Sequence, residues 1–182
     1  MLPRILIDTC VLYPTVMREV VLGAAREGLF EPMWSRRILD EWARAAIKLG
    51  AAGEAQARAE IALLQAAWPD AEKPPAPGTQ ARLWLPDEDD IHVLAVAVDA
   101  SADFIMTLNA KDFPRATLAE EGIGRVDPDS YLMSLWLDHP DKIAAVVESV
   151  LDQARSLSGE VWEMRALLKK ARLPRLAKAV SR

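Results

Sequence analysis

Four consecutive acidic residues directly precede an apolar segment, and this junction constrains the fold more than any other stretch of the chain. The acids occupy positions 87–90, and the apolar segment covers positions 91–98. The segment does not alternate between apolar and polar residues, and its alanines favour a helix. We therefore expect a buried helix running to about residue 100. Asp89 or Asp90 would begin it, with Asp89 the better N-cap, because an acid there accepts backbone N–H groups and meets the positive end of the helix dipole. Asp87 and Glu88 are expected to be solvated.

Two short apolar segments that end in polar residues predict strands of a parallel sheet. Residues 4–7 are aliphatic without alternation, which is typical of a buried parallel strand, and Asp8 follows them. Residues 103–107 form a similar segment, followed by a polar loop at 108–114. Open α/β sheets bind ligands at the carboxyl ends of their strands. Asp8 could instead cap a following helix, as could Thr9.

The remaining chain is expected to form strands and helices in alternation, and then helices alone. Further short strands are expected at 82–85 and 125–126, and Pro32 limits residues 30–34 to an edge strand or a connection. Ser35 is a good N-cap for a helix over 36–47. Residues 70–78 contain three prolines and a glycine and predict a loop. The other expected helices cover 16–27, 54–67, 130–137, 140–157 and 159–171, with a last turn near Leu176.

Composition limits the compartment and the partners that we expect. A single cysteine, Cys10, excludes an internal disulfide framework and fits a reducing cytosol. The first residues contain no apolar stretch long enough for a signal peptide or a membrane span, so we expect a cytoplasmic protein without a membrane partner. The net charge of −5 does not indicate a nucleic-acid binder, unless bound divalent cations reverse the local field.

Glu41 is the acid whose position within a helix is least ordinary. It lies three residues after Ile38 and four before Ala45, which places it beside the apolar face of its helix. A carboxylate that is partly buried needs a partner. Arg37 and Arg44 lie four residues before and three after it, so a simple ion pair is the alternative to a functional role.

The acids at the ends of successive elements are expected to converge at one edge of the sheet. Like charges within a few ångströms raise one another's pKa unless a cation intervenes. Oxygen ligands select hard Mg²⁺ or Mn²⁺ over zinc, and such ions can orient a water molecule for attack on a phosphodiester. The acids concerned are Asp8, Glu41, Asp90 and Asp112.

Four motifs in this order resemble those of PIN-domain ribonucleases, of the VapC type found as the toxin in bacterial toxin–antitoxin pairs. Ile-Leu-Ile-Asp-Thr-Cys-Val-Leu at 5–12 is similar to the first strand and first acid of the family, and Ser-Arg-Arg-Ile-Leu-Asp-Glu-Trp at 35–42 to the helix with the second acid. Residues 87–95 resemble the third motif with Asp90 as its acid, and residues 104–113 the fourth. The resemblance covers residues 4–114.

The resemblance implies an α/β fold, a three-layer α/β/α sandwich with a central parallel sheet, and a metal-dependent endoribonuclease. We expect a nuclease domain over residues 1–126 and a helical C-terminal extension over 127–182 packed on it. Asp8, Asp90 and Asp112 would bind Mg²⁺ or Mn²⁺, with Glu41 acting directly or through a metal-bound water. The implied partners are an RNA substrate, a cognate antitoxin protein and a second copy of the chain in a homodimer. Candidates for positioning substrate or water are Thr9, Arg44, Thr107, Asn109 and Lys111.

One departure from the family pattern supports a different class of function. Many members carry an acid two residues after the threonine of the fourth motif, where this chain has Asn109. An asparagine can ligate a metal or hydrogen-bond a water, but it adds no negative charge. The alternative is therefore a catalytically inactive PIN-like module that binds RNA or protein. The basic C-terminal segment could likewise contact RNA, or present cations at helix ends or to a partner.

Other classes of site fit the residues less well. A phosphatase of the haloacid-dehalogenase type needs a second acid two residues after Asp8, where Cys10 stands. A receiver domain could use Lys111 but would leave Glu41 and the acids at 87–90 unexplained. A zinc site is not expected, because Cys10 has no partner cysteine and is expected to be a small buried residue. His92 is expected to pack or hydrogen-bond on its own helix.

Overall fold

The computed structural model describes residues 1–181, and these residues form a parallel five-stranded sheet. The strand order is β3-β2-β1-β4-β5, and every neighbouring pair is parallel. The strands are β1 (Arg4–Ile7), β2 (Glu31–Ser35), β3 (Glu72–Lys73), β4 (Phe104–Met106) and β5 (Gly124–Val126). The first strand lies at the centre and its Ile5, Leu6 and Ile7 are fully buried, as the unbroken aliphatic segment predicts.

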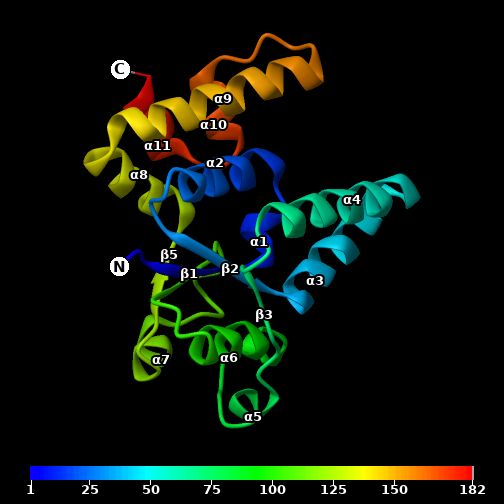
Figure 1. Cartoon of the computed structure of the whole chain (residues 1–182), viewed down its shortest axis with the longest axis vertical. Helices are drawn as coiled ribbons and strands as arrows, with labels where there is room; N and C mark the ends of the chain where they lie inside the picture. Colours follow the sequence, from blue (N-terminus) through cyan, green and yellow to red (C-terminus); the bar gives the residue numbers. More distant parts are fainter. Residues whose placement is uncertain (182) are drawn as a thin grey trace.

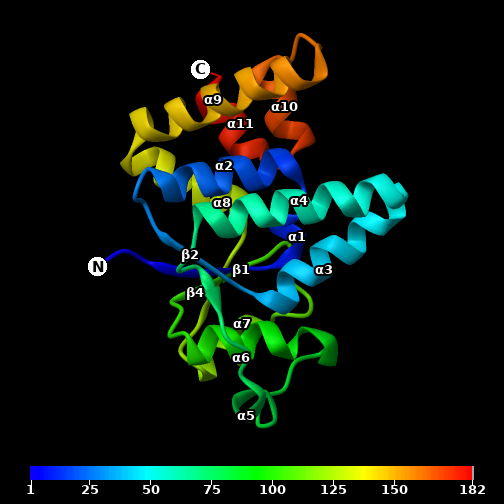
Figure 2. The same ribbon diagram turned by 45° about the vertical axis from the view of Figure 1, so that its right-hand side comes forward.

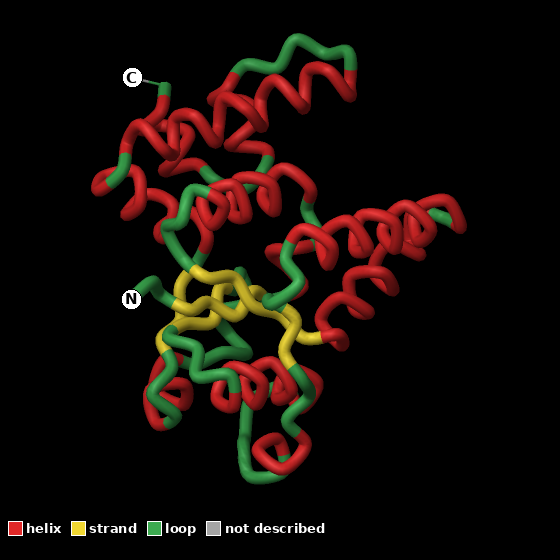
Figure 3. Tube along the Cα trace, in the orientation of Figure 1, coloured by secondary structure: helices red, strands yellow, loops and turns green. Residues whose placement is uncertain are grey.

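Helices cover both faces of the sheet, so the predicted three-layer α/β/α sandwich is confirmed (Figures 1 and 3). One face carries α2 (Thr15–Arg26), α8 (Pro128–Asp138), α9 (Pro140–Ser158), α10 (Met164–Lys170) and α11 (Pro174–Val180). The other face carries α5 (Pro77–Gln80), α6 (Ile91–Asp99) and α7 (Arg115–Glu120). No helix among residues 1–181 is long and apolar enough to cross a membrane.

A pair of helices projects beside the sheet from the carboxyl end of β2 (Figure 2). These are α3 (Arg36–Ala46) and α4 (Ala51–Ala67), joined by the short 3-10 helix η1 (Ile47–Leu49). The predicted N-cap of α3 is confirmed, since Ser35 Oγ accepts a hydrogen bond from the Ile38 N–H at 3.3 Å. The four-residue helix α1 (Thr9–Leu12) and the six-residue α7 were not predicted, because segments this short carry too few apolar repeats.

The position of β2 contradicts the expectation of an edge strand or a connection, because β2 lies between β1 and β3. The Trp34 N–H donates to Ala71 O on the β3 side, so the nitrogen of Pro32, two residues earlier, faces the same side. The two-residue β3 pairs only with Trp34 and Ser35 and does not reach that far. Pro32 therefore removes no ladder hydrogen bond.

Three further local expectations are wrong. The segment 83–85 has no regular structure: Leu85 is buried, but Trp84 is 64% exposed and no strand pairs there. The fifth strand is instead β3, which lies inside the predicted loop at 70–78 and was missed because Glu72 and Lys73 are polar. The helix expected over 159–171 begins only at Met164, since Gly159, at φ +68°, ends α9 in the left-handed conformation and residues 160–163 are irregular.

The C-terminal helices pack on α2 through a close approach at Gly23. A Cβ on Gly23 would lie 2.5 Å from Val146 Cγ1 of α9, so a side chain at this position would force the two helices apart. Lys142 Nζ donates to Glu27 O, and Tyr131 of α8 meets Phe30 edge-on with ring centroids 5.7 Å apart. The same hydrophobic core therefore includes residues of the sheet and of the C-terminal helices.

Candidate active site

The fold brings acids from four segments to the carboxyl ends of the parallel strands. Asp8 directly follows β1, and Glu41 lies on α3, which follows β2. The 3-10 helix η2 (Glu88–Asp90) leads into α6 and carries Asp90. Asp112 lies in the loop after β4. This is the end of an open α/β sheet at which ligands bind.

Asp8 is 7% exposed and each of its carboxylate oxygens accepts a hydrogen bond. Oδ1 accepts from the Thr9 N–H at 2.7 Å and thereby caps α1, so Asp8 both caps a helix and stands at a strand end. Oδ2 accepts from Thr107 Oγ1 at 2.7 Å and from Cys10 Sγ at 3.1 Å. Thr107 is itself buried after β4, so the pairing of β1 with β4 fixes the Asp8 side chain.

Cys10 is a protonated thiol in this site. Burial, followed by the charge of Asp8, raises the pKa of the Cys10 thiol to about 12. A nucleophilic or metal-binding cysteine needs its thiolate. Cys10, which was expected to be buried and is partly exposed, therefore acts as a small hydrogen-bond donor to Asp8.

Asp87, Asp90 and Asp112 form an acidic group whose spacing could hold a metal ion. One carboxylate oxygen from each of the three lies within 4.8 Å of the others. Burial, followed by the charges of Asp8, Asp87 and Asp112 in that order, raises the pKa of Asp90 to about 6, although the charge of His92 opposes the shift. Asp87 was expected to be solvated. It is exposed but belongs to this group, whereas Asp8 is not one of the three.

The capping expectation for Asp89 is wrong, and this explains how Asp90 is free to face the acidic group. Asp87 Oδ1 accepts a hydrogen bond from the Asp89 N–H at 3.0 Å and so caps η2. The Asp90 side chain makes no capping hydrogen bond at the start of α6. The extra 3-10 turn moves the cap two residues earlier than a single helix starting at 90 would require.

Asn109 lies between two of the acids. Its Nδ2 donates to Asp112 Oδ2 at 2.7 Å and lies 3.4 Å from Asp90 Oδ2, while its backbone N–H donates to Thr107 Oγ1 at 3.0 Å. The amide thus separates two carboxylates that would repel each other. Rotation of the amide by 180° about its last bond would turn its oxygen toward the same space.

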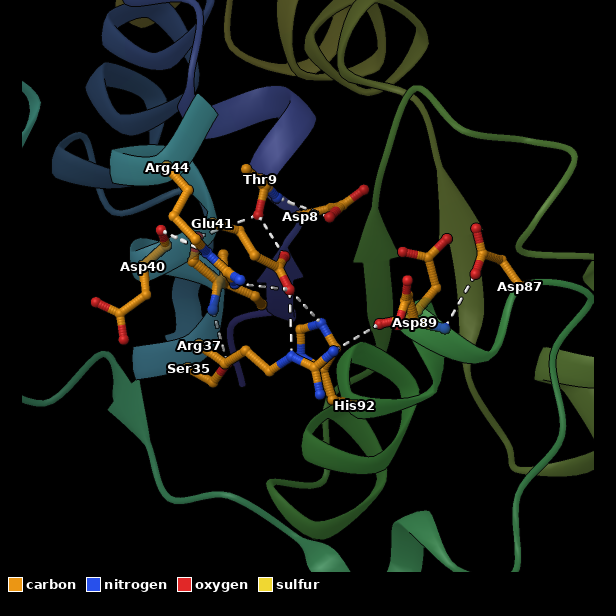
Figure 4. Close-up of polar contacts among 12 residues, drawn as sticks. Asp8, Thr9, Ser35, Arg37, Asp40, Glu41, Arg44, Asp87, Asp89 and His92 are labelled. Atoms are coloured by element: carbon orange, nitrogen blue, oxygen red, sulfur yellow. Dashed lines mark hydrogen bonds and ion pairs between the residues drawn. The ribbon is translucent and has the colours of Figure 1, made fainter. Parts of the chain in front are cut away.

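Glu41 is surrounded by four donors, and Figure 4 shows side chains from α3, α1 and α6 converging on its carboxylate. Thr9 Oγ1 donates to Oε2 at 3.1 Å and Arg37 Nε to Oε1 at 3.2 Å, while Arg44 Nη2 is 3.9 Å from Oε1. His92 Nε2 lies 2.9 Å from Oε1 without the alignment of a hydrogen bond. Burial alone would raise the pKa of Glu41, but the contacts with His92, Thr9 and Arg37 lower it below its ordinary value.

His92 and Arg37 have roles in this site that the sequence did not indicate. His92 is 5% exposed and reaches across to α3 rather than bonding on its own helix. Arg37 was expected only as an ion-pair partner of Glu41, and its Nη2 also donates to Asp89 O at 3.3 Å, joining α3 to η2. The signal available was that the histidine comes two residues after Asp90, but it does not reveal which helices face each other.

Two of the predicted positioning residues are held loosely. Arg44 has a side chain that is 62% exposed, and its other contact is from Nε to Asp40 O at 3.4 Å. Lys111 is exposed and makes no ion pair or side-chain hydrogen bond within residues 1–181. Thr9 and Thr107, in contrast, are fixed by hydrogen bonds to Glu41 and Asp8.

The donor set fits a hard divalent cation. The group contains only carboxylate oxygens, with no histidine or cysteine as a member, which favours Mg²⁺ or Mn²⁺ over zinc. The raised pKa of Asp90 shows that the site is electrostatically unfavourable when all its acids are ionised. A bound cation would remove this cost.

A family model described as "PIN domain" matches residues 4–111, which is more than half of the chain and spans β1 to the loop after β4. No curated protein and no solved structure matches the chain.

Proposed function

The chain belongs to the PIN-domain family, and we propose that it is a divalent-metal-dependent endoribonuclease that hydrolyses RNA phosphodiesters. PIN domains are generally nucleases. The observation that carries the proposal is the convergence of Asp87, Asp90 and Asp112 within 4.8 Å, beside an ionised Glu41. Acids at such spacing raise each other's pKa, and a site of this kind in a family of nucleases is a candidate for catalysis rather than for stability.

The residues divide into those that hold a cation and those that orient water. Asp87, Asp90 and Asp112 would hold Mg²⁺ or Mn²⁺, with Asn109 and Asp8 beside them. When bound, the cation would supply Lewis acidity toward the phosphoryl oxygens and lower the pKa of a water molecule. Glu41 stays ionised at neutral pH, because its pKa is lowered, and its Oε atoms can accept hydrogen bonds from a water molecule and orient it.

We extend the proposal to the toxin of a toxin–antitoxin pair, acting in the cytoplasm as a homodimer with a nuclease domain over residues 1–126. The resemblance of the four motifs to toxin ribonucleases supports this part. We expect a neighbouring reading frame that encodes a small DNA-binding protein. Expression of the chain should arrest growth, and co-expression of that protein should relieve the arrest. Harmless expression of an RNase-active chain would contradict it.

Asn109 favours a second candidate, an inactive module that binds RNA or protein. In the structure its Nδ2 donates to Asp112, so the amide already compensates part of the negative charge that a cation would otherwise neutralise. A site that is compensated in this way has a weaker demand for a metal ion.

Cleavage of a structured RNA by matched variants separates the two candidates. Wild type and Asp89→Asn are expected to cleave in Mn²⁺ and not in EDTA, whereas Asp90→Asn loses at least roughly 100-fold in rate, since even residues that only support metal ligands contribute 10- to 100-fold. Asp89 is the control because it is exposed and its side chain makes no hydrogen bond among residues 1–181. Equal rates in wild type and Asp90→Asn would refute the nuclease proposal, and Mn²⁺ binding without cleavage of any RNA would favour the module.

A further inference from the structure

A groove lined by arginines lies beside Glu41 and is not part of the acidic group. It has a volume of about 820 Å³ and lies between α3, α4, the segment around α5 and α6. Four arginines line it: Arg36, Arg37 and Arg44 from α3, and Arg58 from α4. Asp40 is the one acid in the lining. On a chain with a net charge of −5, this is a local concentration of positive charge.

The placement of these arginines opposes the stability of α3. Arg36 and Arg37 occupy the first two positions of the helix, and the first turn contains no acid. Cations at this end meet the positive pole of the helix dipole and are unfavourable there. Positions at which a sequence opposes its own fold are expected at functional sites. An anion bound in the groove would reverse this local penalty.

The ion pairs that the arginines make do not compete strongly with an anionic ligand. Arg36 Nε is 3.6 Å from Asp40 Oδ1, and Arg58 Nη2 is 2.8 Å from Glu54 Oε1. The side chains of Arg36 and Arg58 are 58% and 53% exposed, so these are surface pairs of the kind that contribute little free energy. Both guanidinium groups can therefore turn to a ligand.

The groove is continuous with the candidate active site through Arg37 and His92. Arg37 lines the groove and contacts both Glu41 and the Asp89 carbonyl (Figure 4). His92 also lines the groove, is 5% exposed, and its buried Nδ1 has no hydrogen-bond partner among residues 1–181. A buried polar atom without a partner is costly, and a ligand or water in the groove could supply one.

We propose that this groove binds the phosphodiester backbone of the single-stranded RNA that extends beyond the scissile bond. The inference rests on the proposed function. Arg36 and Arg44 are separated by eight residues of α3, about 12 Å along the helix, so the positive charge forms a strip rather than a point. A strip of positive charge that begins at the acids suits a polyanion. One phosphodiester of the RNA would lie at the acids, and the adjacent phosphodiesters would lie along α3. Guanidinium groups match phosphate oxygens in a bidentate geometry.

The test compares two double variants that remove the same charge from different surfaces. The double variant Arg36→Gln with Arg58→Gln removes two of the four arginine charges of the groove. It leaves Arg37 and Arg44, which contact Glu41, in place. Lys169→Gln with Lys178→Gln is the control, because both lysines are exposed on the C-terminal helices that form the other basic surface. Circular dichroism confirms that each is folded. Binding of a fluorescein-labelled 20-nucleotide single-stranded RNA is measured in EDTA over a range of salt concentrations, and cleavage of the same RNA in Mn²⁺.

The groove variant is expected to bind roughly tenfold more weakly, and the slope of log Kd against log salt is expected to fall by about 1.4, at about 0.7 for each phosphate that the variant no longer neutralises. Arg36→Lys with Arg58→Lys recovers part of the binding, and the control binds like wild type. Unchanged binding by the groove variant overturns the proposal, as does weaker binding by the control alone, which would assign RNA to the C-terminal helices. Equal competition by polyglutamate would also overturn it in favour of an acidic protein. If wild type cleaves the RNA and the groove variant binds it as tightly as wild type does, this inference is refuted and the proposed nuclease function is not.

Discussion

Replacing Asp90 with asparagine should stabilise the protein in the absence of metal. The pKa of Asp90 is raised from its ordinary 3.8 to about 6 by burial and by the neighbouring acids. This corresponds to about 3 kcal/mol of unfavourable free energy for the ionised group at neutral pH. Asp90 is only half-buried, so solvent screening reduces the expected gain to about 1.5 kcal/mol. For a chain of this size, the melting temperature should rise by about 3–6 °C.

The pH dependence of this gain distinguishes repulsion from other causes. Because the folded-state pKa is raised, protonation of Asp90 favours the folded state: wild type has this contribution below about pH 4 and loses it as pH rises through about 6. The gain from Asp90→Asn should therefore appear at pH 7.5 and vanish at pH 4, measured by thermal circular dichroism in EDTA. Asp89→Asn, with the same change at an exposed neighbour, should shift the melting temperature by less than about 2 °C. A fall in the melting temperature of Asp90→Asn at pH 7.5 would refute the reasoning and show that Asp90 supports α6.

Three further outcomes follow from the same group of acids. Mn²⁺ binding to wild type, measured by the electron paramagnetic resonance of free Mn²⁺, should be about tenfold weaker at pH 5 than at pH 7.5, because a proton competes at Asp90, and a flat profile would contradict this. Asp87→Asn keeps the cap on Asp89, since asparagine is as good a cap as aspartate, so it should weaken Mn²⁺ binding roughly tenfold without a loss of melting temperature. Unchanged affinity would remove Asp87 from the site. Asn109→Asp replaces a donor to Asp112 with a like charge, so the metal-free protein should lose about 1 kcal/mol in urea unfolding and bind Mn²⁺ more tightly; weaker binding would be the contrary result.

The sequence predicted the parts of the fold that rest on continuous apolar segments. The segments at 4–7 and 103–107 predicted β1 and β4, because strands buried on both faces are aliphatic throughout. Strand β3 was missed for the opposite reason, since a two-residue edge strand of Glu72 and Lys73 has no apolar signature. Pro32 was expected at an edge because a proline inside a sheet normally leaves the neighbouring strand without one hydrogen bond. The neighbouring β3 has two residues and does not reach Pro32, so no hydrogen bond is lost.

The candidate site was predictable where it depends on position along the chain and not where it depends on orientation. Glu41 was identified from its spacing on a helix and Asp90 from the resemblance to the third motif, and the structure places both at the carboxyl ends of the strands. The role of Asp87 depends on a 3-10 turn that moves the cap from Asp89, a choice between hydrogen bonds that differ little in free energy. The contact of His92 with Glu41 depends on how α6 faces α3, which follows from packing across the whole sheet.

The most direct test of a metal-dependent site is a crystal of the wild-type protein soaked in Mn²⁺, with anomalous scattering data collected near the manganese edge. We predict an anomalous peak within coordination distance of carboxylate oxygens of Asp87, Asp90 and Asp112, with Asn109 presenting its amide oxygen to the same space. A peak elsewhere on the protein, or none at this group while Asp90→Asn and wild type bind Mn²⁺ equally in solution, would contradict a metal site at these acids.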